Sequence, residues 1–376
     1  MALTKFRYYN VRPLLEGYPA CRYYVVFGER SNGKTFSSLD VGLENAAKPK
    51  PEMFAYIRRY EEDIRKKRMM NLFAGHEKAG RIKKYFPDWQ FIDYTSGAFR
   101  LARQTSGRKT VETSQHPIGY AFSLNTWERS KGESFPYVTT IIFDEFLSRT
   151  GYLPNEFIAF QNLLSSLIRD RDDVKVIMLG NTVNKYCPYF GEMGLNHVTK
   201  QQPGSVDIYK YGDSGLAVAC AYTPSGRDLG GKASDVYFAF DNPALQMITS
   251  GSWEIAIYPR LPEKYNKEDI IVTAYIEFEG ELVAGDIVSQ TNKAPFIFFY
   301  QKKTGIPKWE ADNAPIYSNK WEFSLNRHMG ITKQSDTISK LIIKLIRENR
   351  AAYATNDTGE IVRNFLKWST TQNILT

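Results

Sequence analysis

Residues 23–35 constrain the fold of this chain more than any other stretch. An apolar run, Tyr-Tyr-Val-Val-Phe, leads into Gly28-Glu-Arg-Ser-Asn-Gly33-Lys34-Thr35, the G-x-x-x-x-G-K-T pattern known as Walker A. The pattern needs a strand before it and a helix after it, and a helix is expected from Phe36. Its glycines permit a tight turn in which backbone N–H groups and the helix N-terminus surround phosphate. The segment predicts a nucleotide site, with a turn that uses glycine only for its geometry as the alternative.

Each residue type in this loop has an expected role. Lys34 would reach the β- and γ-phosphates, and the Thr35 hydroxyl would bind Mg²⁺. ATP and Mg²⁺ are therefore the predicted cofactors. The residues expected to line the nucleotide are Gly28, Glu29, Arg30, Ser31, Asn32, Gly33, Lys34, Thr35 and Phe36.

A carboxylate pair follows a second apolar strand. Val138-Thr-Thr-Ile-Ile-Phe ends in Asp144-Glu145, the Walker B pattern. Asp144 would hold Mg²⁺, and Glu145 would polarise the attacking water as a general base. A further strand is followed by Asn181, the candidate sensor of the γ-phosphate, for which a simple turn residue is the alternative. Both Walker patterns together predict nucleotide hydrolysis.

The length of 376 residues predicts two domains. Strands and helices alternate, which predicts an α/β fold: a P-loop NTPase domain with a mostly parallel sheet, then a smaller α/β domain. The Pro- and Gly-rich run 224–231 marks a linker. We expect a P-loop ATPase domain over 1–222, a linker over 223–252 and a second domain over 253–376. Expected strands are 53–58, 119–124, 138–143, 174–179, 253–258, 270–278, 282–289 and 295–300, with a hairpin over 91–103 and helices over 152–171, 337–353 and 360–368.

Positive charge is concentrated in one part of the chain. The net charge is +8, and residues 58–84 carry ten Lys and Arg against four Asp and Glu, a local excess of +6. A solvated helix face is one interpretation. The other is a surface that follows DNA phosphate, with affinity that falls steeply with salt. The candidate DNA contacts are Arg59, Arg65, Lys66, Lys67, Arg100, Arg103, Arg108 and Lys109.

The three cysteines indicate neither a disulfide framework nor a zinc site. Cys21, Cys187 and Cys220 are odd in number and widely spaced, without a C-x-x-C pair. The N-terminus has no signal-peptide pattern, and no apolar run reaches the roughly 18 residues of a membrane span. We therefore expect a soluble intracellular protein.

Several segments together resemble the DNA-packaging (encapsidation) ATPases of small short-tailed phages of the Picovirinae type. These belong to the ASCE (RecA-like) branch of P-loop motors and are distant relatives of terminase large subunits, so the resemblance implies a fold of that kind for the first domain. The resemblance is close over roughly residues 20–190 and thin beyond the linker. The residues that carry it are Tyr56-Ile-Arg-Arg-Tyr60, Phe135 to Phe146, Tyr152-Leu-Pro-Asn-Glu156, Arg169-Asp-Arg171, Leu179-Gly-Asn181 and Asn184 to Phe190.

The resemblance adds roles to four basic residues. Arg169 matches the position of an arginine finger that enters the neighbouring subunit's site, where it would stabilise charge on the transferring phosphoryl group. Arg171 is its rival. Lys131 matches a basic position that acts across the ring, and Arg30 resembles an extra loop arginine of terminase-type motors. The expected catalytic set is Glu145, Lys34, Arg169 and Arg30, and the trans-acting pair is Arg169 and Lys131.

The sequence also departs from the family's pattern. Glu61 replaces a basic residue after the Arg-Arg-Tyr segment, so no role is carried over there. The family's C-terminal domain resembles an RNase H-like nuclease without its acidic cluster. Glu277, Glu279, Glu281 and Asp286 lie near strands here. The alternation in Glu277-Phe-Glu-Gly-Glu281 is typical of a solvated strand face at a turn, and we expect no metal-dependent nuclease activity.

The resemblance implies an ATPase that moves double-stranded DNA into a procapsid through the portal. Its expected partners are duplex DNA, the portal and other copies of itself in a ring, with a pentamer as the expected count. Some members also engage a packaging RNA. The expected location is the host cytoplasm, at the procapsid. The alternatives are another P-loop enzyme, such as a helicase-like translocase or a kinase, and a nucleic-acid binder with a degenerate nucleotide site.

Overall fold

Two separate sheets divide the chain. The computed structural model describes residues 8–105, 111–130, 132–149, 151–224, 253, 256–261, 263–320, 322, 324–331 and 336–372. The chain forms two compact units, Met1–Glu254 and Ile255–Thr376. The expected linker over 223–252 lies outside the described residues except for Thr223 and Pro224.

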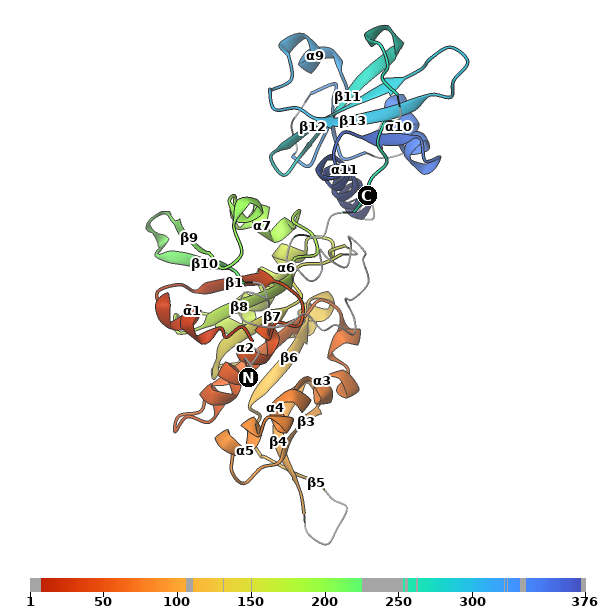
Figure 1. Ribbon diagram of the computed structural model, residues 1–376. Helices are drawn as coiled ribbons and strands as arrows, with labels where there is room; N and C mark the ends of the chain where they lie inside the picture. The colour runs from red at the N-terminus through yellow and green to blue at the C-terminus, as the bar shows by residue number, and fades with distance from the viewer. Residues whose placement is uncertain are drawn as a thin grey trace, which may run out of the picture. The chain divides into compact units, whose positions relative to one another are not determined.

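A parallel sheet forms the centre of the first unit. Within the described residues it has ten strands, in the order β3-β4-β6-β2-β7-β8-β1-β10-β9, with β5 paired to β4. The neighbours from β6 to β10 are parallel, and the flanking strands are antiparallel (Figure 1). The strands are β1 (Tyr23–Gly28), β2 (Met53–Arg58), β3 (Phe91–Thr95), β4 (Ala98–Gln104), β5 (Val111–Thr113), β6 (Gly119–Ser123), β7 (Val138–Asp144), β8 (Lys175–Asn181), β9 (Val206–Tyr211) and β10 (Leu216–Tyr222).

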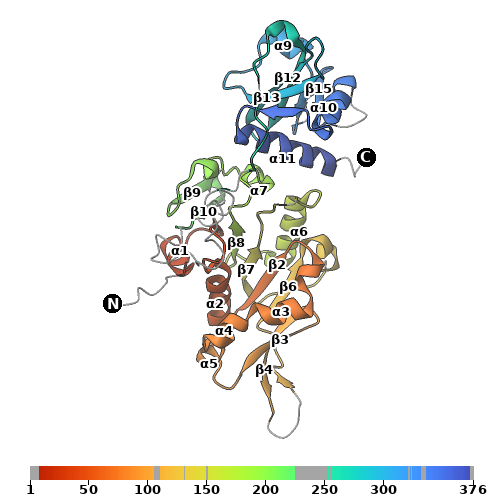
Figure 2. The ribbon, with the colours of Figure 1, turned by 45° about the vertical axis from the view of Figure 1, so that its right-hand side comes forward.

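Helices cover both faces of this sheet (Figures 1 and 2). Successive residues of a strand point to opposite faces. Val25 and Phe27 of β1 therefore pack in one core with α6 and α7, whereas Tyr24 and Val26 pack in the other with α1 to α5. Because both faces are buried, the strands are continuously apolar. The helices are α1 (Arg12–Gly17), α2 (Lys34–Ala46), α3 (Lys66–Leu72), α4 (Ala74–Lys78), α5 (Arg81–Tyr85), α6 (Glu156–Ile168) and α7 (Pro188–Glu192).

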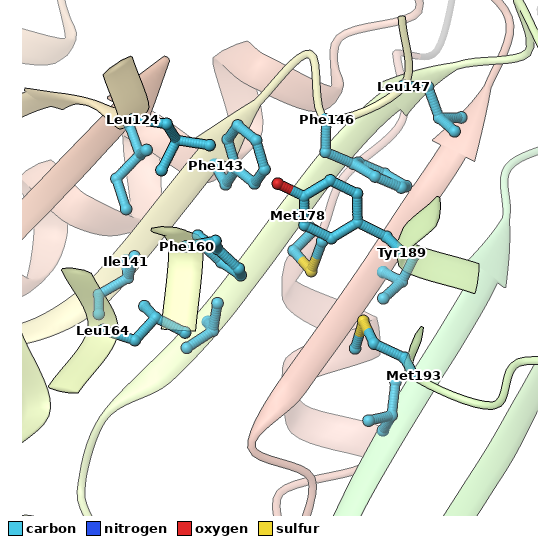
Figure 3. Close-up of a cluster of buried hydrophobic side chains, with 14 of the residues drawn as sticks. Leu124, Ile141, Phe143, Phe146, Leu147, Phe160, Leu164, Met178, Tyr189 and Met193 are labelled. Atoms are coloured by element: carbon cyan, nitrogen blue, oxygen red, sulfur yellow. The ribbon is translucent and has the colours of Figure 1, made fainter. Parts of the chain in front are cut away.

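Aromatic packing fixes the end of β7 (Figure 3). The ring of Phe143 lies 4.9 Å from that of Phe160 on α6 and 5.7 Å from that of Tyr189 on α7. Met178 of β8 belongs to the same buried cluster. Such packing holds the strand rigidly, so the next residue, Asp144, starts from a fixed position.

The second unit is a sheet with helices. Within the described residues its strand order is β15-β14-β11-β12-β13-β16. The segment β11-β12-β13 is antiparallel, and β14, β15 and β16 pair in parallel with their neighbours. The elements are β11 (Ile270–Phe278), β12 (Glu281–Val288), β13 (Phe296–Gln301), α9 (Lys308–Asn313), β14 (Ile316–Ser318), β15 (Arg327–Met329), α10 (Thr337–Arg347), β16 (Ala351–Tyr353) and α11 (Asn356–Gln372).

Two predicted elements of this unit are wrong. The helix expected over 337–353 ends at Arg347, because Asn349 adopts φ 56° and the chain turns into β16. The strand expected over 253–258 is absent from the described residues 256–258. There the N–H groups of Ala256 and Tyr258 donate to side chains of α11 rather than to a strand. The predicted strands before residue 224, the 91–103 hairpin and the other helices are confirmed within a few residues.

Two further observations concern the whole described chain. All three cysteines are free and buried. None of the helices in the described ranges combines the length and the apolar character that a membrane crossing requires.

Candidate nucleotide site

The carboxyl ends of four parallel strands bring the predicted residues together. Gly28 of β1 is in register with Asn181 of β8, and Asp144 of β7 with Leu179 of β8. Arg58 ends β2, which is next to β7. In open α/β sheets ligands bind at this edge.

The 28–35 loop has the backbone conformation that its glycines predict. Gly28 and Gly33 have φ of +152° and +97°. A Cβ on Gly28 would lie 2.0 Å from the Thr223 hydroxyl, and one on Gly33 would lie 2.8 Å from Cβ of Tyr8. Gly33 is the N-cap of α2, and no side chain caps that helix. The N–H groups at the start of α2 can therefore bind an anion.

Lys34 is folded back into this loop. Its side chain is buried, and Nζ donates to the carbonyls of Gly28 (3.4 Å) and Glu29 (2.6 Å) and to the amide oxygens of Asn32 (3.1 Å) and Asn181 (3.3 Å). Burial lowers the pKa of Lys34 to about 8, although the charge of Asp144 opposes the shift. The structure thus places Asn181 against Lys34, where a γ-phosphate sensor is expected.

Asp144 lies beside Thr35, as the Walker patterns require. The Thr35 hydroxyl lies 3.2 Å from both carboxylate oxygens, and the Tyr56 hydroxyl donates to Oδ2 at 2.8 Å. Burial raises the pKa of Asp144, and the charge of Arg58 and the bond from Tyr56 counteract it. A buried carboxylate beside a hydroxyl offers the oxygen ligands that Mg²⁺ prefers, and Mg²⁺ needs only one or two carboxylates with phosphates. Within the described residues no group of three or more His, Cys, Asp and Glu forms a metal site.

Glu145 follows in an unusual backbone conformation. Its φ is 60°, in the left-handed region that residues with a Cβ rarely adopt. Its half-exposed side chain accepts from Arg58 Nη2 at 2.6 Å. Its N–H donates to Oδ1 of Asp144 at 3.1 Å. The expected general base therefore lies next to the expected metal ligand, with an arginine on its carboxylate.

A pocket of about 230 Å³ opens beside Glu145 and Asn181, and Lys34, Thr35 and Asp144 are not among the residues that line it. Its lining is polar and rich in arginine, with Glu145 and Asn181 on the wall. Arginine forms bidentate bonds with phosphate, so the pocket suits the terminal phosphate of a bound nucleotide. The arginines that line it are Arg30, Arg58, Arg59 and Arg149.

The side chain of Phe36 points away from this pocket region. Its ring stacks on His76 of α4 with a centroid distance of 3.9 Å, and the Phe36 carbonyl lies 3.0 Å from Nε2 of His76. Only the backbone of Phe36 remains available for phosphate, so the predicted contact is confined to its N–H group. Ser31 adopts φ 57° and Asn32 donates to the Thr223 hydroxyl at 2.8 Å, which supports the loop from β10.

Arg169 lies near the amino ends of the parallel strands, opposite the ends that carry Asp144 and Asn181. α6 follows β7 and runs back for 13 residues, about 20 Å at the usual helical rise, and Arg169 is its exposed C-cap. Its guanidinium donates to the Glu133 carbonyl at 2.7 Å. Arg171 is engaged more fully, because it donates to four backbone carbonyls. The structure does not bring Arg169 to the site of its own chain, and Lys131 lies outside the described residues.

Seven of the eight predicted DNA contacts separate into three groups. Arg65, Lys66 and Lys67 are exposed around the start of α3. Arg100 and Arg103 are partly buried. Arg100 donates to the Ser114 carbonyl, and Arg103 donates to the Glu112 carboxylate. Arg108 and Lys109 lie outside the described residues.

The prediction is wrong for Arg59. This residue is 6% exposed and forms an ion pair of 2.7 Å with the buried Glu156. A basic run in the sequence does not show which of its side chains is buried. Arg59 is buried because it pairs with the buried carboxylate of Glu156. Its guanidinium is therefore not available to a DNA backbone.

Sequence reasoning missed Tyr56 and Arg58 as site residues. Both lie on β2, whose carboxyl end borders the end of β7, and both bind the Asp144–Glu145 pair. The available signal was the position of a polar pair at the end of a buried strand next to Walker B. Arg58 instead counts in the basic run 58–84, for which the sequence leaves a solvated helix face and a phosphate-binding surface as the two interpretations.

Comparisons with known proteins agree with this geometry. The DNA packaging protein of Bacillus phage B103 is 32% identical over 173 residues, which are 45% of this chain and 47% of that protein. The DNA packaging protein of Bacillus phage phi29 is 29% identical over 191 residues, 50% of each chain. The chain thus spans about half the length of the relatives that it matches.

Solved structures share the fold over most of the chain. The bacteriophage Phi-29 viral genome packaging motor assembly matches with a TM-score of 0.54 and 18% identity, covering 95% of this chain and 97% of that chain. The Phi-28 gp11 DNA packaging motor matches with a TM-score of 0.52 and 17% identity, covering 97% and 98%. Residues 3–202, more than half of the sequence, match the family described as Podovirus DNA encapsidation protein (Gp16). The chain belongs to this family of DNA encapsidation proteins.

Proposed function

We propose that this protein is an ATPase that drives double-stranded DNA into a phage procapsid through the portal. The observation that carries the proposal is the meeting of Lys34, Thr35, Asp144, Glu145 and Asn181 at the carboxyl edge of one parallel sheet. Family membership and the relatives named as DNA packaging proteins support the choice of substrate. The protein would act as a homo-oligomeric ring, a pentamer in our proposal, attached to the procapsid in the host cytoplasm.

The proposed domains are a P-loop motor over 1–222, a linker over 223–252 and a vestigial RNase H-like domain over 253–376. The strand order β13-β12-β11-β14-β15, antiparallel in its first three members and then parallel, supports the last assignment. Its acidic residues are held by other side chains. Glu277 binds Arg327, and Asp286 accepts from Tyr265 and Thr273. These bonds support a structural role rather than nuclease chemistry.

ATP binding would reorganise the loop around Lys34. The ammonium group now bonds to loop oxygens, and the triphosphate would replace them as acceptor, next to the N–H groups that open α2. Thr35 and Asp144 would hold Mg²⁺, which neutralises charge on the phosphates when bound. Burial raises the pKa of Asp144, because the charged carboxylate is shielded from water. A bound divalent cation would stabilise that charge in place of water.

Glu145 would accept the proton of the attacking water. Arg58 controls how well it can do so. The guanidinium bound at 2.6 Å occupies the carboxylate that would accept the proton. We therefore assign the observed pair to a resting arrangement, from which Glu145 is released as water and the γ-phosphate come into line beside Asn181.

Arg169 would complete the site of a neighbouring subunit. Arg169 is exposed at the end of the sheet opposite the Lys34 of its own chain, which supports action in trans. In the neighbouring site its charge would stabilise negative charge in the transition state. Exposed Arg65, Lys66 and Lys67 would bind DNA phosphate without reading bases, as a motor that accepts every sequence requires.

Displacement of a third strand from a DNA triplex tests the proposal. Wild-type protein with ATP should displace the strand as it moves along the duplex, and Glu145→Gln should not. The matched control is Glu192→Gln, which changes an exposed glutamate on α7 and should behave as wild type. A wild-type protein that splits ATP without displacing the strand would refute translocation. A Glu145→Gln protein that displaces it normally would refute the assigned base.

A further inference from the structure

Arg59 lies beneath the turn that carries Glu145. Its Nε donates to Glu156 at 2.7 Å, Nη1 donates to the Glu145 carbonyl at 3.1 Å, and Nη2 donates to the Phe146 carbonyl at 2.8 Å. One planar guanidinium therefore bonds to a carboxylate and to two consecutive backbone carbonyls. Only arginine has donors in a fixed fork that can do this.

The turn at Glu145 needs such support. A left-handed φ in a residue with a Cβ is sterically costly and persists only where the surroundings impose it. The Glu145 N–H bonds to Asp144 Oδ1 at 3.1 Å, and the Phe146 N–H bonds to the Leu179 carbonyl at 3.1 Å. With Arg59 on the two carbonyls, all four backbone polar groups of these residues are bound.

Glu156 anchors the guanidinium from the other side. Its carboxylate is buried and also accepts from the Leu153 N–H at 2.7 Å and the Tyr189 hydroxyl at 2.9 Å. Burial alone would lower the pKa of Arg59, but the bond and charge of Glu156 outweigh burial and raise it. Arg59 is therefore a permanently charged group held at a fixed place.

Arg58, the last residue of β2, and Arg59, which follows it, bind different parts of Glu145. Arg58 binds its carboxylate and Arg59 binds its backbone carbonyl, because the two side chains leave the strand end in different directions. Arg58 can release the carboxylate without moving the turn, since Arg59 is anchored independently by Glu156.

We propose that Arg59, anchored by Glu156, is a positioning residue for ATP hydrolysis: it fixes the strained turn that aims Glu145 at the attacking water. The inference rests on the proposed function, because it assigns to Arg59 an effect exerted through Glu145. It replaces the surface role that the basic run predicts for Arg59.

Arg59→Lys tests the proposal. Lysine keeps the charge beside Glu156 but cannot bond to both carbonyls at once. We expect kcat for ATP to fall at least about tenfold, the scale of a misplaced general base, with KM within about twofold of wild type. The matched control is Arg260→Lys in the second unit, where the arginine donates to the Tyr353 carbonyl, and it should leave both constants unchanged. A wild-type kcat in Arg59→Lys overturns the proposal.

A double-mutant cycle separates positioning from general support of the fold. If Arg59 acts through Glu145, Arg59→Lys should cause no further loss of the residual rate in a Glu145→Gln protein. Equal fold-losses in both backgrounds overturn the proposal and leave the proposed function intact. Full hydrolysis by Glu145→Gln alone overturns the proposed base itself. Should Arg59→Lys fail to melt cooperatively, Glu156→Gln, which keeps the shape of the anchor, is measured in the same cycle with the same two readings.

Discussion

The affinity for ATP should fall as the pH rises above about 8, because Lys34 is buried. Burial lowers the pKa of Lys34 to about 8 in the nucleotide-free protein. A bound triphosphate stabilises the charged ammonium and raises that pKa. Binding is therefore linked to proton uptake above pH 8: the interaction is fully present below the pKa of the free protein, weakens as the pH rises above that pKa, and is lost as the pH passes the raised pKa of the complex.

The size of the effect follows from the fraction of Lys34 that is protonated. At pH 9 about one molecule in eleven carries the charge when the pKa is about 8, so Kd should rise about tenfold, or about 1.4 kcal/mol. The assay is titration with a fluorescent ATP analogue and Mg²⁺ between pH 7.5 and 9.5, above the titration of the phosphate itself.

Lys34→Arg is the control for this titration. An arginine stays charged throughout the range, so the variant should bind more weakly but with a nearly flat pH profile. A wild-type Kd that stays constant up to pH 9.5 would refute the assignment of Lys34 as the phosphate-binding cation. An equal rise of Kd in Lys34→Arg would assign the pH dependence to another group.

Three further predictions concern the loop, the Arg58 pair and the basic surface. Gly28→Ala should weaken ATP binding at least about tenfold, because a Cβ would meet the Thr223 hydroxyl at 2.0 Å and the φ of +152° disfavours it; isothermal titration measures it, and wild-type affinity would contradict the loop geometry. Arg58→Ala should raise the rate of ATP hydrolysis without DNA, because it frees the Glu145 carboxylate from the guanidinium that binds it at 2.6 Å; phosphate release measures that rate, and an unchanged rate would exclude Arg58 as the regulator of Glu145. Replacing Arg65, Lys66 and Lys67 by glutamine should reduce the slope of log Kd for duplex DNA against log salt by up to about 2.7. Filter binding measures that slope, and an unchanged value would place the DNA surface elsewhere.

Much of the first unit could be predicted because its strands are buried on both faces. Tyr23–Gly28 and Val138–Asp144 are continuous apolar runs with polar residues at their carboxyl ends, and parallel pairing brings those ends to one edge. The motifs therefore predict which residues meet at the carboxyl ends of these strands. The roles of those residues remain predictions.

Other features depended on tertiary contacts that no local pattern contains. The sequence around Arg59 does not distinguish it from an exposed arginine. Its burial depends on the ion pair with the buried Glu156, which lies 97 positions later in the chain. β16 has three residues and continues an apolar helical pattern, so its separation from α10 depends on pairing with β13. The contact between Arg58 and Glu145 depends on the pairing of β2 with β7, which the local sequence does not specify.

The most direct test of the central claim is ATP hydrolysis by the purified chain in the presence of duplex DNA. Phosphate release should be stimulated by duplex, and Glu145→Gln should bind ATP with Mg²⁺ as wild type does but release phosphate only at a small residual rate. A purified wild-type protein that neither binds nor splits ATP with duplex present would contradict the assignment of residues 28–35, Asp144 and Glu145 to a motor site.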